Sequence, residues 1–343
     1  MKIKHIATIT IFLFSIGVKA QDPIFTQFFL VPETLNPAIT GLANTWNAGI
    51  LHRSQWPEGN RKIDTQFGFA NNMITDQIGI GGTVLNQREV FTGYNYFQIN
   101  GAFSYNVELE NDWSIRFGLD AGFGRKSFNF KNLLLEDQIN SNDGTITATS
   151  VDSAVLKDSN SINFIDLSAG FFIASENAWF GTALKHLNRP DISFTENRNV
   201  PLDLFLTLHG GYYFELEGSP LMNSLGDPTL LLTANYMRQS QYNRLDIGSI
   251  LEYNRFYFGL TATTNPQGKS SNSHILTSVN PVVAFKTNEF TFGYSYDINT
   301  SKFGNSQGVH ELSLTWQSSR RCDRCDNYKV KLKRNDINGF QKI

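Results

Sequence analysis

The chain has little cysteine, little charge and no long apolar segment after its first twenty residues. Its two cysteines, Cys322 and Cys325, are three positions apart near the C-terminus, so no disulfide framework holds the fold. Charged residues make up 17% of the chain, below the roughly 25% typical of soluble proteins. The net charge of −2 argues against nucleic acid as a partner. No run of 18 apolar residues follows residue 20, so we expect no transmembrane helix.

The first twenty residues have the features of a secretion signal. A basic start is followed by an apolar run over residues 6–18, which has the length of a signal-peptide core. The small residue Ala20 then stands where a signal peptidase would cut. We therefore predict a signal peptide over residues 1–20 and leave it out of the fold.

Apolar and polar residues alternate over most of the remaining chain. In residues 112–124, which read DWSIRFGLDAGFG, every second residue from Trp113 to Phe123 is apolar and the others are polar or glycine. Residues 289–298 repeat this pattern. Strand side chains point to opposite faces with period 2, so each such segment predicts a strand with one apolar and one polar face. Many amphipathic strands after a secretion signal indicate an all-β fold, a transmembrane β-barrel of the outer membrane.

Alternating runs between turn signals predict about fourteen antiparallel strands. An even count places both termini in the periplasm. Most long connections then lie outside and most short ones inside, except 215–228 and 240–243, and one miscounted strand would explain either exception. The expected strands are 46–55, 62–70, 77–86, 94–107, 112–126, 161–174, 178–186, 203–214, 229–239, 244–253, 256–263, 274–286, 289–297 and 308–317.

The segments on either side of the predicted barrel, residues 46–318, are not strands. Prolines interrupt residues 21–45, which either lie in the lumen as a plug or trail in the periplasm. The apolar side chains of this segment favour the plug because they would be costly to leave in water. Residues 319–343 form a basic periplasmic tail, which is either a solvated end or a dock for a partner. The candidate partner-binding residues of the tail are Arg320, Arg321, Lys331 and Lys333.

Several segments in fixed order carry a family resemblance. They are QDPIFTQF and LNPAITG near the N-terminus, RSQWP at 53–57, IGIGGTVLNQ at 78–87, KHLNRPDISF at 185–194, LTLHGGYYF at 206–214, FGYSYDINTSKF at 292–303 and HELSLTW at 310–316. Together they extend over nearly all of the chain after the signal peptide, and their order and spacing are more specific than any one of them. In these segments the chain resembles the PorP/SprF family, outer-membrane proteins of the type IX secretion and gliding machinery of Bacteroidetes.

The resemblance implies a fourteen-stranded barrel, similar in outline to long-chain fatty-acid channels, that assists secretion. It implies binding of the C-terminal signal domain (type B) of a secreted surface protein or adhesin, and support of its export or cell-surface attachment. Type IX components in the periplasm or outer membrane are the further implied partners, and membrane lipid surrounds the barrel. The alternative is a channel for fatty acids or other hydrophobic compounds. The lumen-facing Arg116, Asp120 and Ser168 argue mildly against that channel.

The residues with the most reactive side chains do not form a convincing active site. His52 and Ser54 face the same side of the first expected strand, which suggests either a lipid-acting enzyme or, with more weight, a pair at the barrel rim. The other histidines have no ligand spacing. We therefore predict no enzyme, no catalytic residue, no cofactor and no metal. Asn188 and Arg189, where the seventh strand leaves the membrane, either contact cargo or cap the rim.

Overall fold

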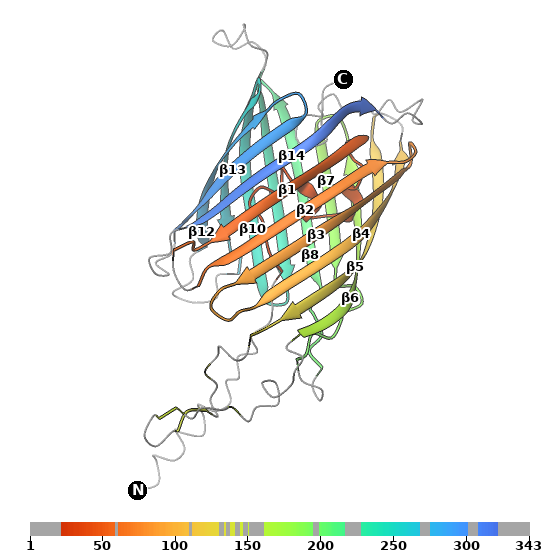
Figure 1. The fold of residues 1–343 in the computed structure, drawn as a ribbon. Coiled ribbons are helices and arrows are strands. Elements are labelled where there is room, and N and C mark those ends of the chain that lie inside the picture. The colour runs from red at the N-terminus through yellow and green to blue at the C-terminus, as the bar shows by residue number, and fades with distance from the viewer. Residues whose placement is uncertain are drawn as a thin grey trace.

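The computed structural model describes residues 22–321 except for gaps at 59–60, 110–111, 130–133, 135–137, 141–144, 147–149, 151–160, 195–198, 217–227, 268–274 and 301–307, and except for the side chains of 319–321. Within these ranges the chain forms one tilted barrel (Figure 1). Its strands are β1 (Thr45–Gln55), β2 (Ile63–Met73), β3 (Ile78–Glu89), β4 (Asn95–Glu108), β5 (Ser114–Ser127), β6 (Ser161–Ala174), β7 (Ala178–Lys185), β8 (Phe205–Glu215), β9 (Thr229–Gln239), β10 (Tyr242–Tyr253), β11 (Phe256–Thr264), β12 (Leu276–Lys286), β13 (Phe290–Asn299) and β14 (Val309–Arg321).

The barrel is closed, and each strand pairs with its neighbours in sequence. All pairings are antiparallel, and β1 joins β14 with Leu51 opposite Ser313. The predicted closed barrel of fourteen strands is confirmed. Every expected range overlaps one strand, and its ends differ from the observed ends by at most four residues.

The two connections that break the loop-length rule do not arise from a miscounted strand. β9 and β10 are joined by Ser240 and Gln241 alone, and Ser240 has the positive φ of 53° that a tight hairpin turn requires. β8 and β9 are joined by the longer connection 216–228, most of which lies outside the described residues. The strand count therefore stands at fourteen.

Exposed apolar side chains alternate with buried residues along the strands. In β5, Phe117 is 52% exposed, whereas the adjacent Arg116 is 1% exposed. In β13, Phe292 is exposed and Thr291 is buried. Outward apolar residues form the surface that a membrane barrel presents to lipid, and this is the polarity that the alternating sequence predicts. No helix within the described ranges is long and apolar enough to cross a membrane.

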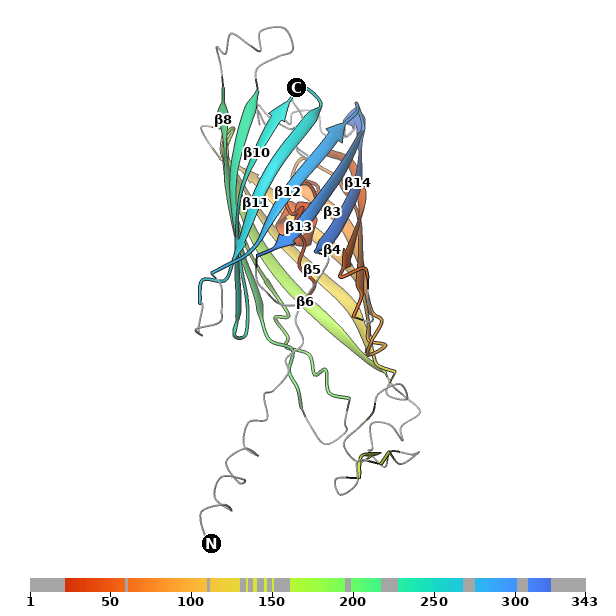
Figure 2. The same ribbon diagram turned by 90° about the vertical axis from the view of Figure 1, so that its left-hand side faces the viewer.

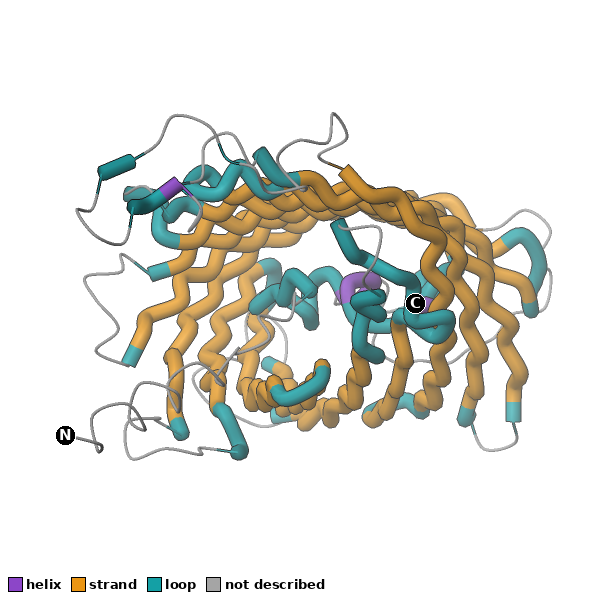
Figure 3. The backbone as a smooth tube through the Cα atoms, turned by 90° about the horizontal axis from the view of Figure 1, so that it is seen from below, coloured by secondary structure: helices purple, strands orange, loops and turns teal. Residues whose placement is uncertain are grey.

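Residues 22–44, called the luminal segment below, lie inside the barrel, as Figure 2 and Figure 3 show. Two short 3-10 helices, η2 (Pro32–Thr34) and η3 (Pro37–Ile39), both begin with proline, whose fixed φ suits the first helical position. The Oδ1 atom of Asn36 accepts the Ala38 N–H at 2.9 Å and caps η3. Gly41, with a φ of 73°, then turns the chain toward β1.

The luminal segment runs along the length of the lumen. Asp22 contacts His186 and Gln239, which follow β7 and end β9. At the opposite end of the barrel, Thr45 begins β1 beside Arg321 at the end of β14. Asp22 and the end of β14 therefore lie at opposite mouths of the barrel, so the expectation that both termini lie on one side of the membrane does not hold for the two ends of the described chain.

Candidate functional site

The luminal segment is held to the wall by a buried ion cluster where the first and last strands meet. This seam cluster consists of Thr26, Gln27, Arg53, Asp297 and Glu311. Arg53 donates to Glu311 at 2.8 Å and to Asp297 at 2.9 Å. The backbone N–H groups of Thr26 and Gln27 donate to the two oxygens of Glu311 at 3.1 and 2.7 Å, and the Thr26 hydroxyl donates to Asp297 at 2.9 Å.

The charges of the seam cluster depend on one another. Two carboxylates face one guanidinium, and all three groups are almost fully buried. A buried carboxylate is tolerated only when it is paired and hydrogen-bonded. The luminal segment therefore supplies the hydrogen-bond donors that complete the neutralisation of Glu311, while β1, β13 and β14 supply the charged groups.

A second polar cluster holds the start of the luminal segment, toward the same mouth of the barrel as the seam cluster. This mouth cluster is centred on His186, whose Nε2 is 2.7 Å from Asp22 and whose Nδ1 is 2.9 Å from Asp166. Gln98 donates to Asp166 at 2.9 Å, and Gln239 accepts the Asp22 N–H at 2.9 Å. The Asp166 carboxylate is thus shared between the imidazole and Gln98, whereas Gln239 holds the backbone of Asp22.

The surroundings in the mouth cluster favour the charged forms of His186 and Asp22, which both lie outside the strands. Burial opposes the charge of His186, but Asp22 and Asp166 outweigh it and raise the pKa of the imidazole to about 9. Burial also opposes the charge of Asp22, but His186, with Lys126 and Lys185, holds the pKa of that carboxyl below its usual range. At neutral pH Asp22 is therefore a carboxylate beside the imidazolium of His186.

The middle of the luminal segment rests on a patch of the wall that has no side chains. A Cβ atom added at Gly118 would lie 2.1 Å from the Ala38 nitrogen, and one at Gly170 would lie 2.0 Å from Asn36 Oδ1. Asn36 donates to the Phe171 carbonyl of β6 at 2.9 Å. These glycines are required because η3 lies directly against the strand backbone.

Apolar side chains pack much of the space between the luminal segment and the wall. Phe28, Leu30 and Ile39 of the luminal segment are buried against the inner faces of the strands. A cavity of about 30 Å³ lies beside Phe28 in this packed region. The wall residues of this packed region include Leu51, Phe67, Phe69, Phe172, Phe205, Tyr213, Leu231, Ile250, Tyr257 and Val282.

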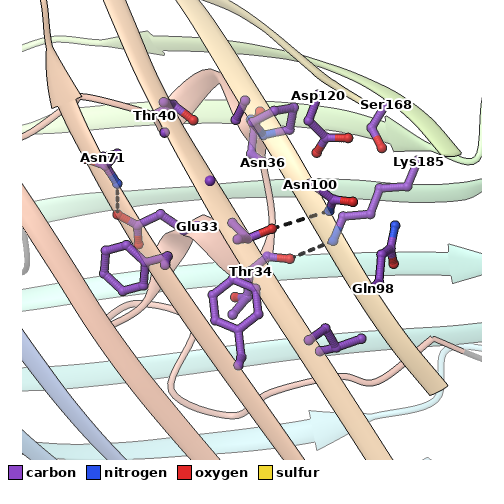
Figure 4. A pocket seen from close by; sticks show the side chains of 18 of the residues that line it. Glu33, Thr34, Asn36, Thr40, Asn71, Gln98, Asn100, Asp120, Ser168 and Lys185 are labelled. Carbon is purple, nitrogen blue, oxygen red and sulfur yellow. Dashed lines mark hydrogen bonds between the residues drawn. The ribbon is translucent and has the colours of Figure 1, made fainter. Parts of the chain in front are cut away.

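A small polar cavity separates the luminal segment from strands β2 to β7 (Figure 4). Glu33 faces it with one oxygen bound to Asn71 at 3.0 Å and the other without a protein partner. Lys185 reaches across it to the Thr34 carbonyl at 2.8 Å. Burial raises the pKa of Glu33 to about 7.

The volume of this polar cavity determines what it can hold. It measures about 60 Å³, and each water needs roughly 10–15 Å³ measured in this way. The cavity therefore takes a handful of waters. Sites for organic ligands begin at about 300 Å³. With the luminal segment in place, the cavity serves to hydrate Glu33 and its neighbours.

The partner-binding candidates of the sequence fall at both mouths of the barrel. Asn188 donates to the Ile165 carbonyl at 2.7 Å and accepts the Leu167 N–H at 3.1 Å, so its side chain braces the edge of β6 beyond the end of β7. Arg189 is half exposed and lies 3.5 Å from Asp203. Arg320 and Arg321 end β14, without described side chains, and Lys331 and Lys333 lie outside the described residues.

His52 and Ser54 do face the same outer side of β1, but they do not form a nucleophile and base. The Ser54 hydroxyl donates to Asp64 at 2.8 Å, and His52 Nε2 is 3.9 Å from the same carboxylate. An activated serine requires its hydroxyl to be bonded to the base. The carboxylate instead stands between the two side chains, which is the arrangement of a polar rim.

The remaining reactive residues give no metal site in the part of the chain that the structure describes. No group of three or more histidine, cysteine or acidic side chains there could hold an ion. His186 and His209 are buried in the lumen, while His310 lies on the outer face beside Tyr294. His274, both cysteines and most of the acidic loop 127–160 lie outside the described residues.

Sequence reasoning missed the residues that anchor the luminal segment. Arg53, Asp297 and Glu311 were charged residues at inward positions of otherwise ordinary strands. Their inward position could have marked them in the sequence, because a charged side chain on the lumen side of a strand needs a partner. Asp22 and His186 gave no such signal, since they are 164 residues apart and Asp22 lies outside any periodic segment.

The whole barrel and its luminal segment match one protein family. A family described as type IX secretion system membrane protein PorP/SprF matches residues 17–316. The chain belongs to the PorP/SprF family. It is accordingly a membrane protein of type IX secretion, and its β-barrel places it in the outer membrane. No curated protein matches the sequence.

Similar solved structures share the barrel architecture at low identity. A mutant of the Rh. blastica porin is 7% identical, covers 80% of this chain and 99% of its own, and has a TM-score of 0.34. CdiB from Acinetobacter baumannii is 8% identical over 80% of this chain and 60% of its own, with a TM-score of 0.43. A Pseudomonas aeruginosa FadL homologue is 10% identical over 82% and 92%, with a TM-score of 0.38. None of these likenesses carries a functional argument.

Proposed function

We propose that this PorP/SprF protein is an accessory barrel that binds the C-terminal signal domain (type B) of a secreted surface protein and supports its export or cell-surface attachment. Contacts with periplasmic ring components belong to the same proposal. The barrel acts as a docking partner in the membrane, and the cargo does not pass through its lumen. Family membership supports the secretion role.

The filled lumen is the observation that carries the docking role. Apolar side chains of the luminal segment pack against the wall, and the polar cavity beside them measures about 60 Å³. A folded domain or an extended chain cannot enter such a space while residues 22–44 are seated. The luminal segment is therefore proposed to act as a plug, and cargo is proposed to bind at a rim.

The proposed orientation places the end of β14 and the basic tail in the periplasm. The end of β5, the start of β6 and Asp22 then lie at the extracellular mouth, as does Arg189 just beyond β7. Arg189 is the better rim candidate for cargo, because the polar atoms of Asn188 are already bonded to β6. Arg320, Arg321, Lys331 and Lys333 are proposed to contact ring components.

The alternative role as a channel for fatty acids is less well supported. A channel of this kind needs an apolar path, and the apolar cavity beside Phe28 and Phe172 measures about 30 Å³. Release of the luminal segment would have to come first.

Purification of the tagged full chain in mild detergent, with mass spectrometry of its companions, tests this function. We expect a large surface protein held by its C-terminal domain, with or without ring proteins. Arg189→Glu should weaken cargo recovery at least fivefold, whereas Arg255→Glu, exposed in the β10–β11 turn at the opposite mouth, should not. A variant ending at residue 318 should lose ring proteins and keep cargo. A lone barrel that carries only lipid would refute the secretion role.

A further inference from the structure

A groove on the membrane-facing side of β1, β2, β3 and β14 is open because one residue in it has no side chain. Gly68 stands between Ile50 and Val84 in one row across the strands. A Cβ atom added there would meet nothing closer than 3.8 Å. The groove measures about 480 Å³, and Phe292 and Leu312 extend its apolar wall.

Hydrogen-bond donors lie at one end of this apolar groove. His52, Gln66 and Asn86 form the next row across β1, β2 and β3, and all three line the groove. Asn86 donates to Gln66 Oε1 at 2.9 Å, which leaves the Gln66 amide nitrogen without a protein acceptor in the described part of the chain. Amide donors facing hydrocarbon are costly, so this end of the groove favours a ligand with oxygen acceptors.

A positive charge lies one row further toward the strand ends. Arg88 is exposed, and no acidic side chain among the described residues pairs with it. The neighbouring Asp64 is already occupied, since Lys62 lies 2.9 Å away and Ser54 donates to it at 2.8 Å. Four residues of strand separate Val84 from Arg88, which is about 13 Å. Along β3, the apolar part of the groove is thus followed first by the row of hydrogen-bond donors and then by the positive charge of Arg88.

We propose that this groove binds one phosphorylated glycolipid of the lipid A type from the outer leaflet. An acyl chain lies over Gly68, its carbonyl oxygens accept from Gln66 and His52, and a phosphate contacts Arg88. The free charge of Arg88 selects an anionic head group, and the single-residue gap suits one acyl chain. The choice of the outer leaflet rests on the orientation proposed above, but the site itself does not depend on a secretion role.

Lipid analysis of the full chain, purified from its native outer membrane in mild detergent, tests this site. Native mass spectrometry should show about one lipid A per barrel. Gly68→Leu fills the groove and should lower lipid A retention at least fivefold. Gly101→Leu is the matched control, because Gly101 also faces outward, on β4, and has nothing within 4 Å of an added Cβ. Arg88→Gln should weaken retention by a similar factor without altering the groove.

Several outcomes would overturn the lipid site. Equal retention in the Gly68 and Gly101 variants would show that the groove does not select the lipid. A glycerophospholipid or a partner protein in the groove, in place of lipid A, would contradict the proposed ligand. A heat-dependent shift in gel mobility shows that each variant has assembled into a folded barrel. If Gly68→Leu does not assemble, Arg88→Gln still tests the site, because Arg88 is exposed. Cargo recovery is measured separately, so failure of the lipid site is distinguishable from failure of the secretion role.

Discussion

Replacing Arg53 by methionine should release the luminal segment while leaving the barrel closed. Methionine keeps much of the volume of the arginine stem but removes the guanidinium that joins Glu311 to Asp297. In the seated state both carboxylates then remain buried, with only the N–H groups of Thr26 and Gln27 and the Thr26 hydroxyl as donors. Once the segment leaves, water reaches the carboxylates. The loss of Arg53 therefore penalises the seated state more than the released state.

The size of this effect follows from the burial of the pair. Removing one partner of a buried ion pair costs about 3–5 kcal/mol. If most of this cost applies to the seated state, the free energy of releasing the luminal segment falls by about 3 kcal/mol. Every 1.4 kcal/mol is about tenfold in an equilibrium constant. The released population should thus rise about 100-fold or more.

Thiol labelling at a buried position of the luminal segment measures the released population. Ala38 has no exposed surface, so Ala38→Cys reports release when Cys322 and Cys325 are first changed to serine. Arg53→Met should raise its labelling rate about 100-fold. Arg244→Met is the control, because Arg244 also pairs with a buried aspartate, at 2.9 Å, but lies on β10, and its guanidinium binds Asp246 of β10 and Thr263 of β11. Unchanged labelling in Arg53→Met, or an equal rise in the control, would refute the reasoning.

Three further predictions concern the glycine seat, the polar cavity and the outer rim. Gly118→Val should speed labelling at position 38, because even a Cβ atom would lie 2.1 Å from the Ala38 nitrogen; Gly101→Val should not. Because burial raises the pKa of Glu33 from 4.5 to about 7, seating should be favoured fully below pH 4.5 and lose this contribution as pH rises through 7. Glu33→Gln should flatten that part of the labelling profile, after correction for thiol ionisation. Phospholipid turnover by the pure barrel should be absent and unaffected by His52→Ala; turnover lost in that variant would contradict the rim interpretation.

The strands could be predicted from the sequence because a membrane barrel imposes the same pattern on every strand. Lipid on one side and a polar lumen on the other separate Phe117 from Arg116 at adjacent positions. Strand order followed as well, since each strand pairs with the next along the chain. The exceptions to strict alternation are inward apolar residues such as Phe67 and Phe172, which pack against the luminal segment.

The candidate site could not be predicted in the same way, because its contacts are long-range and outside any period. Gln27 and Glu311 are 284 residues apart, and Asp22 and His186 are 164 residues apart. Nothing local in the sequence relates such residues. The family resemblance did mark the segments concerned, since QDPIFTQF and LNPAITG contain Asp22, Gln27 and Asn36. Their physical role became visible only when the structure placed them against the wall.

The seam cluster connects the seating of the luminal segment to closure of the barrel. Arg53 stands opposite Glu311 only when β1 has paired with β14, and Asp297 joins them from β13. The backbone of Thr26 and Gln27 therefore finds its acceptors only on a closed barrel. A segment that binds the closed form and not the open one stabilises closure by its own binding free energy. The N-terminal segment thus fastens the one pairing that joins the two ends of the strand order, in addition to filling the lumen.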